Sequence, residues 1–129
     1  MADNGPGTGD ARPPHVLLAD DDPSIRKMLR SALEAVGYQV TLAASTEEAL
    51  PVLEQGCPDA LIADLVMPGL SGAELARRCH ERCPNTILVF MSGFPPEQLR
   101  TLGVTQVVYL NKPISITELR ALLKQRLGR

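Results

Sequence analysis

The sequence predicts an α/β fold in which a parallel sheet is covered by helices on both faces. Its 129 residues suit one domain. Short apolar runs alternate along the chain with segments of helical periodicity, as expected of repeated strand–helix units. Four of the five runs are apolar throughout, which is typical of parallel strands buried on both faces. We therefore predict five strands, around residues 16–19, 40–43, 60–63, 87–91 and 107–110.

The first predicted helix has clear signals for its N-cap, its buried apolar face and its C-terminal end. Asp22 followed by Pro23 is a favourable N-cap and first helical residue, and Gly37 is suited to the turn that ends the helix. Apolar side chains recur between them at intervals of three and four residues, which predicts one buried face. These side chains are Ile25, Met28, Leu29, Ala32, Leu33 and Val36.

Three more helices open with a capping box, in which a serine precedes a glutamate by three positions. The pairs are Ser45 with Glu48, Ser71 with Glu74, and Ser115 with Glu118. A further short helix is predicted near Pro95 and Pro96. Pro51 falls inside the helix capped by Ser45, so we expect it to kink that helix or to delay its start.

The composition limits the domain organisation and the classes of partner. Residues 1–14 hold three glycines and three prolines, which predicts a disordered arm or linker before a single domain at residues 15–129. With 13 basic and 15 acidic residues, the chain lacks the basic excess expected of proteins that bind nucleic acid or an anionic membrane. No apolar run approaches the roughly 20 residues of a membrane span, and the first residues are not a secretory signal. We expect a cytoplasmic protein.

The three cysteines are an odd number in a chain without an export signal, which favours reduced thiols. They are Cys57, Cys79 and Cys83. Cys79 and Cys83 share a helical stripe with Leu75 and Ala76, so core packing is favoured over a metal site that includes His80.

Polar side chains follow four of the predicted strands. Asp20, Asp21 and Asp22 follow the first strand, Asp64 follows the third, Ser92 the fourth and Lys112 the fifth. Because parallel strands end at one edge of a sheet, these side chains are expected to meet in one pocket. The exception is Asp22, which is best explained as the helix cap.

Facing carboxylates are unfavourable unless a positive charge neutralises them, and they are typical ligands of Mg²⁺. A lysine and a hydroxyl beside such a cation can balance the oxygens of a phosphoryl group. A carboxylate can itself attack phosphorus and form an acyl phosphate. The residues thus predict a Mg²⁺-dependent phosphoryl site with an aspartate as the acceptor.

Residues 15 to about 127 resemble the receiver domain of bacterial two-component response regulators. The motifs that carry the resemblance are VLLADDDPSIR at 16–26, LIADLVMPGLSG at 61–72, VFMSG at 89–93 and YLNKP at 109–113. The resemblance implies a flavodoxin-like (βα)5 doubly wound sheet with strand order 2-1-3-4-5. It also implies a phosphorylation-controlled signalling module whose only catalysis is its own phosphorylation and dephosphorylation.

The resemblance also implies a role for each site residue. Asp64 would accept the phosphoryl group from a histidine kinase or a histidine phosphotransfer protein. Mg²⁺ would be held by Asp21, Asp64 and the Val66 carbonyl, with Asp20 acting through water. Ser92 and Lys112 would each bind a phosphoryl oxygen, and Tyr109 would turn inward with Ser92 as a switch. A cis bond between Lys112 and Pro113 would aim the lysine into the pocket.

Two other functions are weaker. Asp20 and Asp22 form a D-x-D pair after the first strand, as in haloacid dehalogenase-like phosphatases, where Asp20 would be the nucleophile. That interpretation leaves Asp64 unexplained. A flavodoxin would need a phosphate-binding loop where this chain has three acids. The Gly/Pro-rich arm resembles the linker before the C-terminal receiver of a hybrid histidine kinase, and a stand-alone receiver is the other interpretation. In either case we expect any self-association to be a transient dimer.

Overall fold

The computed structural model describes residues 12–92 and 107–128 and contains a five-stranded parallel sheet. The strands are β1 (His15–Ala19), β2 (Gln39–Ala43), β3 (Ala60–Asp64), β4 (Ile87–Ser92) and β5 (Val107–Asn111). They lie in the order β2-β1-β3-β4-β5, and each neighbouring pair is parallel. The predicted fold class, strand positions and strand order are confirmed.

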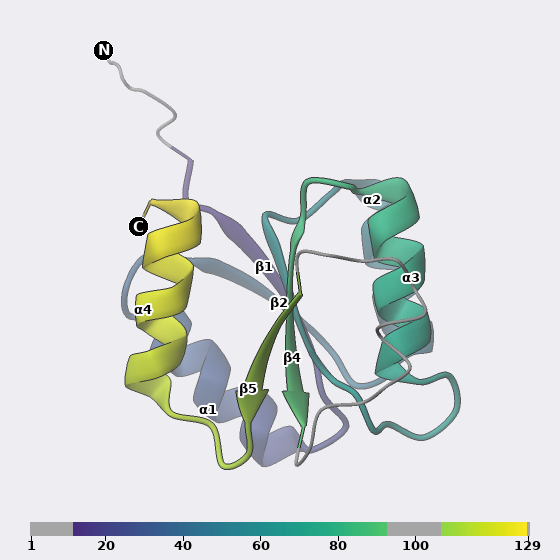
Figure 1. Ribbon diagram of the computed structural model, residues 1–129, viewed down its shortest axis with the longest axis horizontal. Coiled ribbons are helices and arrows are strands. Elements are labelled where there is room, and N and C mark those ends of the chain that lie inside the picture. The colour runs from purple at the N-terminus through teal and green to yellow at the C-terminus, as the bar shows by residue number, and fades with distance from the viewer. Residues whose placement is uncertain (1–11, 93–106, 129) are drawn as a thin grey trace.

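Helices cover both faces of this sheet. They are α1 (Pro23–Glu34), α2 (Thr46–Gln55), α3 (Gly72–Arg82) and α4 (Ile116–Leu127). Helices α1 and α4 lie on one face, and α2 and α3 lie on the other (Figure 1). Among the described residues, no helix is both long enough and apolar enough to cross a bilayer.

Alternate strand residues point into two separate cores. Leu17 of β1 and its partner Leu61 of β3 face α2 and α3, whereas Leu18 and Ile62 face α1 and α4. All four side chains are fully buried, which explains why these strands are apolar at every position. Helix side chains complete the two layers: Leu53, Leu75 and Cys79 in the first, and Leu29, Leu33, Leu119 and Leu123 in the second.

The helix starts follow the predicted caps. The Asp22 carboxylate accepts from the backbone N–H groups of Ser24 and Ile25, at 2.8 and 3.4 Å. The hydroxyl groups of the other N-cap residues accept from the predicted glutamate N–H groups at 3.1 to 3.2 Å. These pairs are Ser45 with Glu48, Ser71 with Glu74, and Ser115 with Glu118. The sequence signals for the start of all four helices are therefore confirmed.

The buried stripe of α1 is narrower than predicted. Leu29 and Leu33 are fully buried, but Met28 and Val36 are 44% and 43% exposed. Met28 lies about 100° around the helix from Leu29, at the flank of the buried face. Val36 lies beyond Glu34, the last helical residue, so the helical spacing no longer directs its side chain toward the sheet.

Arginine side chains satisfy carbonyl groups at the C-terminal ends of two helices. Arg82 of α3 donates from Nε to the Leu53 carbonyl and from Nη2 to the Glu54 carbonyl, at 2.9 and 3.0 Å. Arg120 of α4 donates to the Ala32 carbonyl of α1 from Nε and Nη2, at 3.1 and 2.7 Å. Each arginine thereby joins the two helices that share one face of the sheet.

The cysteine prediction is partly wrong. Cys79 is a free, buried thiol, but Cys57 and Cys83 form a disulfide with their Cα atoms 5.6 Å apart. Cys57 follows α2 and Cys83 caps the end of α3, so the packing of these helices brings the two residues together. A separation of 26 positions hides this pairing from helical periodicity. Cys83 is buried, as predicted, although its sulfur is bonded to Cys57.

Two further expectations fall wholly or largely on residues that the structure does not describe. The helix expected near Pro95 and Pro96 lies outside the described residues, as do residues 1–11 of the expected N-terminal arm. The domain boundary between residues 14 and 15 therefore stays a prediction.

Pro51 lies inside α2, which begins at Thr46 directly after its Ser45 cap, so the proline does not delay the start of the helix.

Replacing Pro51 by alanine should stabilise the protein. Proline has no N–H to donate to the carbonyl four residues earlier, and Pro51 is exposed, so its replacement opens no cavity. We expect Pro51→Ala to raise the free energy of unfolding by about 1 to 3 kcal/mol, measured by urea titration. Glu54→Ala, on an exposed position of the same helix, is the control and should change stability little. A Pro51→Ala protein that is no more stable than the wild type would contradict this prediction.

Candidate functional site

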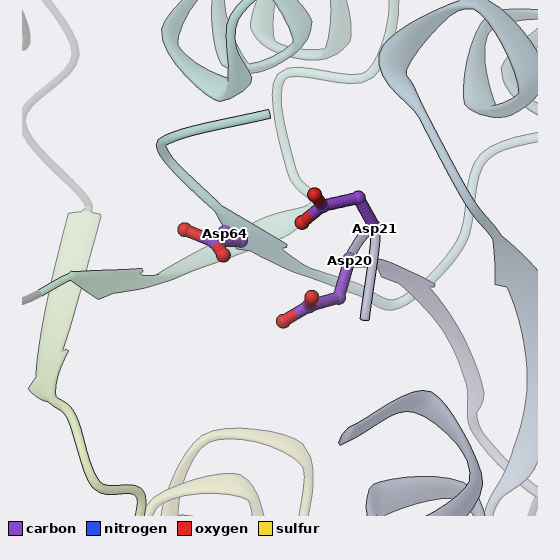
Figure 2. Close-up of side chains that lie close together, drawn as sticks. All are labelled: Asp20, Asp21 and Asp64. Atoms are coloured by element: carbon purple, nitrogen blue, oxygen red, sulfur yellow. The ribbon is translucent and has the colours of Figure 1, made fainter. Parts of the chain in front are cut away.

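Acidic side chains converge at the carboxyl edge of the sheet. Asp20 and Asp21 directly follow β1, and Asp64 is the last residue of β3, the neighbouring strand. One oxygen from each of the three carboxylates lies within 4.8 Å of the other two. Figure 2 shows the three side chains gathered at the ends of these strands. The predicted convergence of Asp20, Asp21 and Asp64 is confirmed.

Asp20 is the most confined of the three acids. Its side chain is fully buried, and its Oδ1 accepts from the Asp22 backbone N–H at 2.8 Å. Its Oδ2 is buried and has no hydrogen-bond partner. Desolvation raises the pKa of the Asp20 carboxyl, the Asp22 N–H lowers it, and the charge of Asp64 raises it further. The net shift is upward, because burial and the neighbouring carboxylates outweigh the Asp22 N–H and the positive charge of Lys112.

Asp64 is buried but has a partner for each oxygen. Oδ1 accepts from the Val66 backbone N–H at 3.0 Å, and Oδ2 accepts from Lys112 Nζ at 2.6 Å. Desolvation lowers the pKa of Lys112, but the hydrogen bond to Asp64 and the charges of Asp64, Asp20 and Asp21 raise it, with a net increase. Lys112 therefore stays protonated beside Asp64 and supplies one positive charge to three carboxylates.

The remaining predicted site residues lie on β4 and β5. Ser92 ends β4, is 7% exposed, and accepts at its carbonyl from the Lys112 backbone N–H at 3.1 Å. Tyr109, on β5, is 36% exposed, so its ring lies at the protein surface. The peptide bond between Lys112 and Pro113 is cis, as predicted. Apart from Tyr109, the site residues predicted from the sequence thus lie at or just after the carboxyl ends of four strands, which the sheet brings to one edge.

No motif in the sequence predicts the contacts that hold the loop after Asp64. The Leu70 backbone N–H donates to Glu47 Oε2 at 3.2 Å, and the Thr46 hydroxyl donates to the Ser71 carbonyl at 3.1 Å. Both acceptor and donor come from the first turn of α2, so this helix fixes the loop that leads to α3. In the sequence, Glu47 has the pattern of an ordinary acid at a helix N-terminus, and no motif reveals its partner.

Gly72 allows α3 to start directly against the backbone of Asp64. A Cβ at position 72 would overlap the Asp64 carbonyl oxygen and lie 2.9 Å from Leu65 Cα. The Gly72 N–H instead donates to the Leu65 carbonyl at 3.2 Å. Gly69, with φ of +79°, makes the turn just before it. Gly72 lies in the LSG segment and is explained by this tertiary contact, whereas Gly69 lies in the MPG segment and is explained by its positive φ.

The donor set fits a hard divalent cation. Three carboxylate oxygens lie within reach of one ion, and the buried Asp20 Oδ2 lacks any other partner. The positive charge of Lys112 is already directed at Asp64 Oδ2. A phosphoryl group, with its negative oxygens and electrophilic phosphorus, could bind between the lysine and such a cation.

Comparison with known proteins gives one consistent result. A model of the response regulator receiver domain matches residues 16–124. The transcriptional regulatory protein TrcR of Mycobacterium tuberculosis is 33% identical over 122 residues, covering 93% of this chain and 48% of TrcR. The phosphate regulon transcriptional regulatory protein PhoB of Rhizobium meliloti is 36% identical over 121 residues, which cover 90% of this chain and 53% of PhoB. The chain spans about half the length of these two curated relatives.

Solved structures agree with this result. A response regulator crystal structure from Chloroflexus aurantiacus has a TM-score of 0.78 and 31% identity, covering 92% of this chain and all of that one. The receiver domain of the hybrid histidine kinase CckA has a TM-score of 0.76 and 34% identity, and the match covers 88% of this chain and 98% of the CckA receiver.

Neutralising Asp20 should stabilise the metal-free protein. Asn can still accept the Asp22 N–H bond, and its amide can donate to a neighbouring carboxylate in place of an unpaired charge. In the presence of a chelator at pH 7, we expect Asp20→Asn to raise the free energy of unfolding by about 1 to 2 kcal/mol.

The pH dependence of this difference follows from the raised pKa of Asp20. The carboxylate destabilises the folded protein above its folded pKa, and protonation relieves this effect. The advantage of Asp20→Asn should therefore shrink as the pH falls through that pKa, and vanish below the ordinary value of 3.8. Urea titrations of both proteins from pH 7 to 3 test this, and an Asn variant that is less stable at pH 7 would contradict it.

Proposed function

Because the chain belongs to the response regulator receiver family, we propose that it is a phosphoacceptor module that receives a phosphoryl group on Asp64. The observation that carries this proposal is the position of Asp64, which lies between the acidic pair after β1 and the ammonium group of Lys112. The haloacid dehalogenase-like alternative would use Asp20 as its nucleophile. That alternative gives no role to Asp64, although Asp64 Oδ2 accepts from the Lys112 ammonium group at 2.6 Å.

The phosphoryl donor is proposed to be a phosphohistidine of a histidine kinase or of a histidine phosphotransfer protein. One oxygen of the Asp64 carboxylate attacks phosphorus, the N–P bond breaks, and the imidazole leaves with the bonding electron pair. An acyl phosphate forms on Asp64. Lys112, already hydrogen-bonded to Asp64 Oδ2, is placed to pair with a phosphoryl oxygen, and the Val66 N–H steadies the other carboxylate oxygen.

The acidic cluster is proposed to hold Mg²⁺. Asp21 and Asp64 would bind it with the Val66 carbonyl, and Asp20 would act through water. When bound, Mg²⁺ offsets the negative charge of the phosphoryl oxygens and of the carboxylates. The chain's own contribution is to bring these carboxylates together on two adjacent strands and to keep Asp20 Oδ2 available.

Ser92 and Tyr109 are proposed to report the phosphorylation of Asp64. Ser92 ends the strand next to the one that carries Asp64, and Tyr109 lies one strand further along. Phosphate on Asp64 would draw the Ser92 hydroxyl toward a phosphoryl oxygen, and the half-exposed Tyr109 ring would move into the space that is vacated. Ser92 would thus bind phosphate and start the switch.

The biological setting is proposed from the relatives. The matching receiver of CckA comes from a hybrid histidine kinase, whereas TrcR and PhoB are transcriptional regulatory proteins. We propose that this module works in the cytoplasm, takes phosphate from a kinase or phosphotransfer partner, and itself contacts neither nucleic acid nor membrane. Its self-association is proposed to be a transient dimer.

Replacing the acceptor should abolish phosphorylation. With acetyl phosphate and Mg²⁺, we expect Asp64→Asn to incorporate at least about 100-fold less acid-labile phosphate than the wild type, because the amide is a poor nucleophile. Intact-protein mass spectrometry measures the incorporation. Asp22→Asn is the matched control, since asparagine preserves the helix cap and should leave phosphorylation intact. Stoichiometric phosphorylation of Asp64→Asn would overturn the assignment.

Mg²⁺ should stabilise the unmodified protein. At a concentration ten times its dissociation constant, a ligand that binds only the folded state adds about 1.4 kcal/mol to the free energy of unfolding. Thermal melts with Mg²⁺ and with chelator measure the effect, which Asp21→Ala should largely remove. Glu54→Gln, on an exposed acid outside the cluster, should retain it. A wild-type melt that is independent of Mg²⁺ would contradict the metal site.

The switch predicts chemical-shift changes on β4 and β5, beyond the strand that carries Asp64. Beryllofluoride, which mimics the phosphoryl group on an aspartate, should shift the NMR signals of Ser92 and Tyr109, and Asp64→Asn should abolish these shifts. Changes confined to Asp64 and the loop that follows it would show that this receiver relays phosphate without the proposed switch.

A further inference from the structure

The disulfide between Cys57 and Cys83 lies at the amino edge of the sheet, away from the acidic cluster. Cys57 precedes β3 and Cys83 precedes β4, whereas Asp64 ends β3. Five residues of β3 place about 15 Å between these two edges. The phosphoryl chemistry on Asp64 makes no use of these cysteines.

The two sulfur-bearing residues differ sharply in accessibility. Cys57 is exposed, whereas Cys83 is 2% exposed. Cys57 lines two surface depressions, of about 630 and 350 Å³, whereas the nearly buried Cys83 lines only the smaller one. Thiol–disulfide exchange needs the attacking thiolate to approach one sulfur in line with the bond to the other. The structure offers that approach from the Cys57 side.

The charges around the disulfide are mainly positive. Arg82 and Arg126 line the smaller depression, and Arg12 lines the larger one. Asp59 lines both, but its Oδ2 already accepts from the His15 backbone N–H at 2.7 Å. Positive side chains favour the thiolate form of a nearby cysteine, and therefore favour a sulfur that leaves as an anion.

We propose that Cys57 and Cys83 form a redox-exchange site, in which a small external thiol attacks the exposed sulfur of Cys57. The external thiolate bonds to Cys57 Sγ, the Cys57–Cys83 bond breaks, and Cys83 leaves as a thiolate that takes a proton from water. A second external thiolate then attacks the external sulfur of the mixed disulfide. The products are an external disulfide and reduced Cys57, so the cysteine pair gains two electrons and two external thiols lose them.

The exchange acts on the contact between α2 and α3. The disulfide joins the segment after α2 to the end of α3, and Arg82 bonds the last carbonyls of α2 at the same place. Reduction removes the covalent link and leaves the arginine bonds. In the cytoplasm, a disulfide that forms and breaks with the thiol pool acts as a redox sensor. Because the arginine bonds remain when the covalent link is lost, the reduced protein stays folded but is less stable.

Mass spectrometry tests which sulfur is attacked. The oxidised protein is mixed with reduced glutathione, quenched with acid at short times, and digested. The result expected is glutathione attached to Cys57, at least about tenfold over attachment to Cys83, with Cys83 as a free thiol. Cys79 is an internal reference: it is buried, desolvation raises its pKa to about 11 against a smaller lowering by Thr86, and it should stay unmodified. Attachment mainly to Cys83, or no Cys57–Cys83 disulfide in protein equilibrated with oxidised glutathione, would overturn the proposal.

Thermal melts test the structural consequence independently. A phosphine reductant should lower the Tm of the wild type by about 10 °C, because the loop closed by the disulfide is released. The Cys57→Ser protein replaces an exposed sulfur and should melt at one temperature with or without reductant. A wild type that is fully reduced by mass yet keeps its Tm would overturn the role assigned to the link. Neither experiment depends on phosphorylation of Asp64.

Discussion

Most of the site architecture follows from the unbalanced charge of three carboxylates at one edge of the sheet. Asp20, Asp21 and Asp64 share a single nearby ammonium group, that of Lys112, among the described residues. Backbone N–H groups from Asp22 and Val66 supply further stabilisation to two of the acids, but Asp20 Oδ2 receives none. The fold thus gathers more negative than positive charge at this edge, and the large apolar cores on the two faces of the sheet offset its unfavourable energy.

The acidic edge also depends on the helices behind it. Gly72 lets α3 begin in contact with the Asp64 backbone, and Thr46 and Glu47 at the start of α2 hold the intervening loop. These contacts determine where the loop after Asp64 lies. A site proposed to bind a partner protein, a metal and a phosphoryl group benefits from a loop that is positioned before any of them arrives.

The sequence predicts the local features well and the long-range contacts poorly. Uninterrupted apolar runs identify the buried strands, and serine–glutamate pairs identify the helix starts, because each signal is contained in a few neighbouring residues. The order of Asp20, Asp64 and Lys112 along the chain predicts their meeting, since parallel strands end at one edge. No comparable rule links Glu47 to Leu70, or Cys57 to Cys83, because these contacts depend on how α2 packs against α3. The exposure of Met28 has the same origin: periodicity gives the direction of a side chain but not the width of the surface that covers it.

The bond from Arg120 to the Ala32 carbonyl has a consequence for the minimal folding unit of this protein. It joins the first helix to the last across 88 positions, and Leu119 and Leu123 beside it complete the core over β1 and β3. A fragment that ends before α4 would therefore leave α1 with an unsatisfied carbonyl, and only α1 would cover the face of the sheet that the two helices share. During synthesis, the first helix can reach its final packing only after the last one has left the ribosome. Despite its repeated strand–helix segments, this protein is expected to fold as one cooperative body rather than as a series of independent repeats.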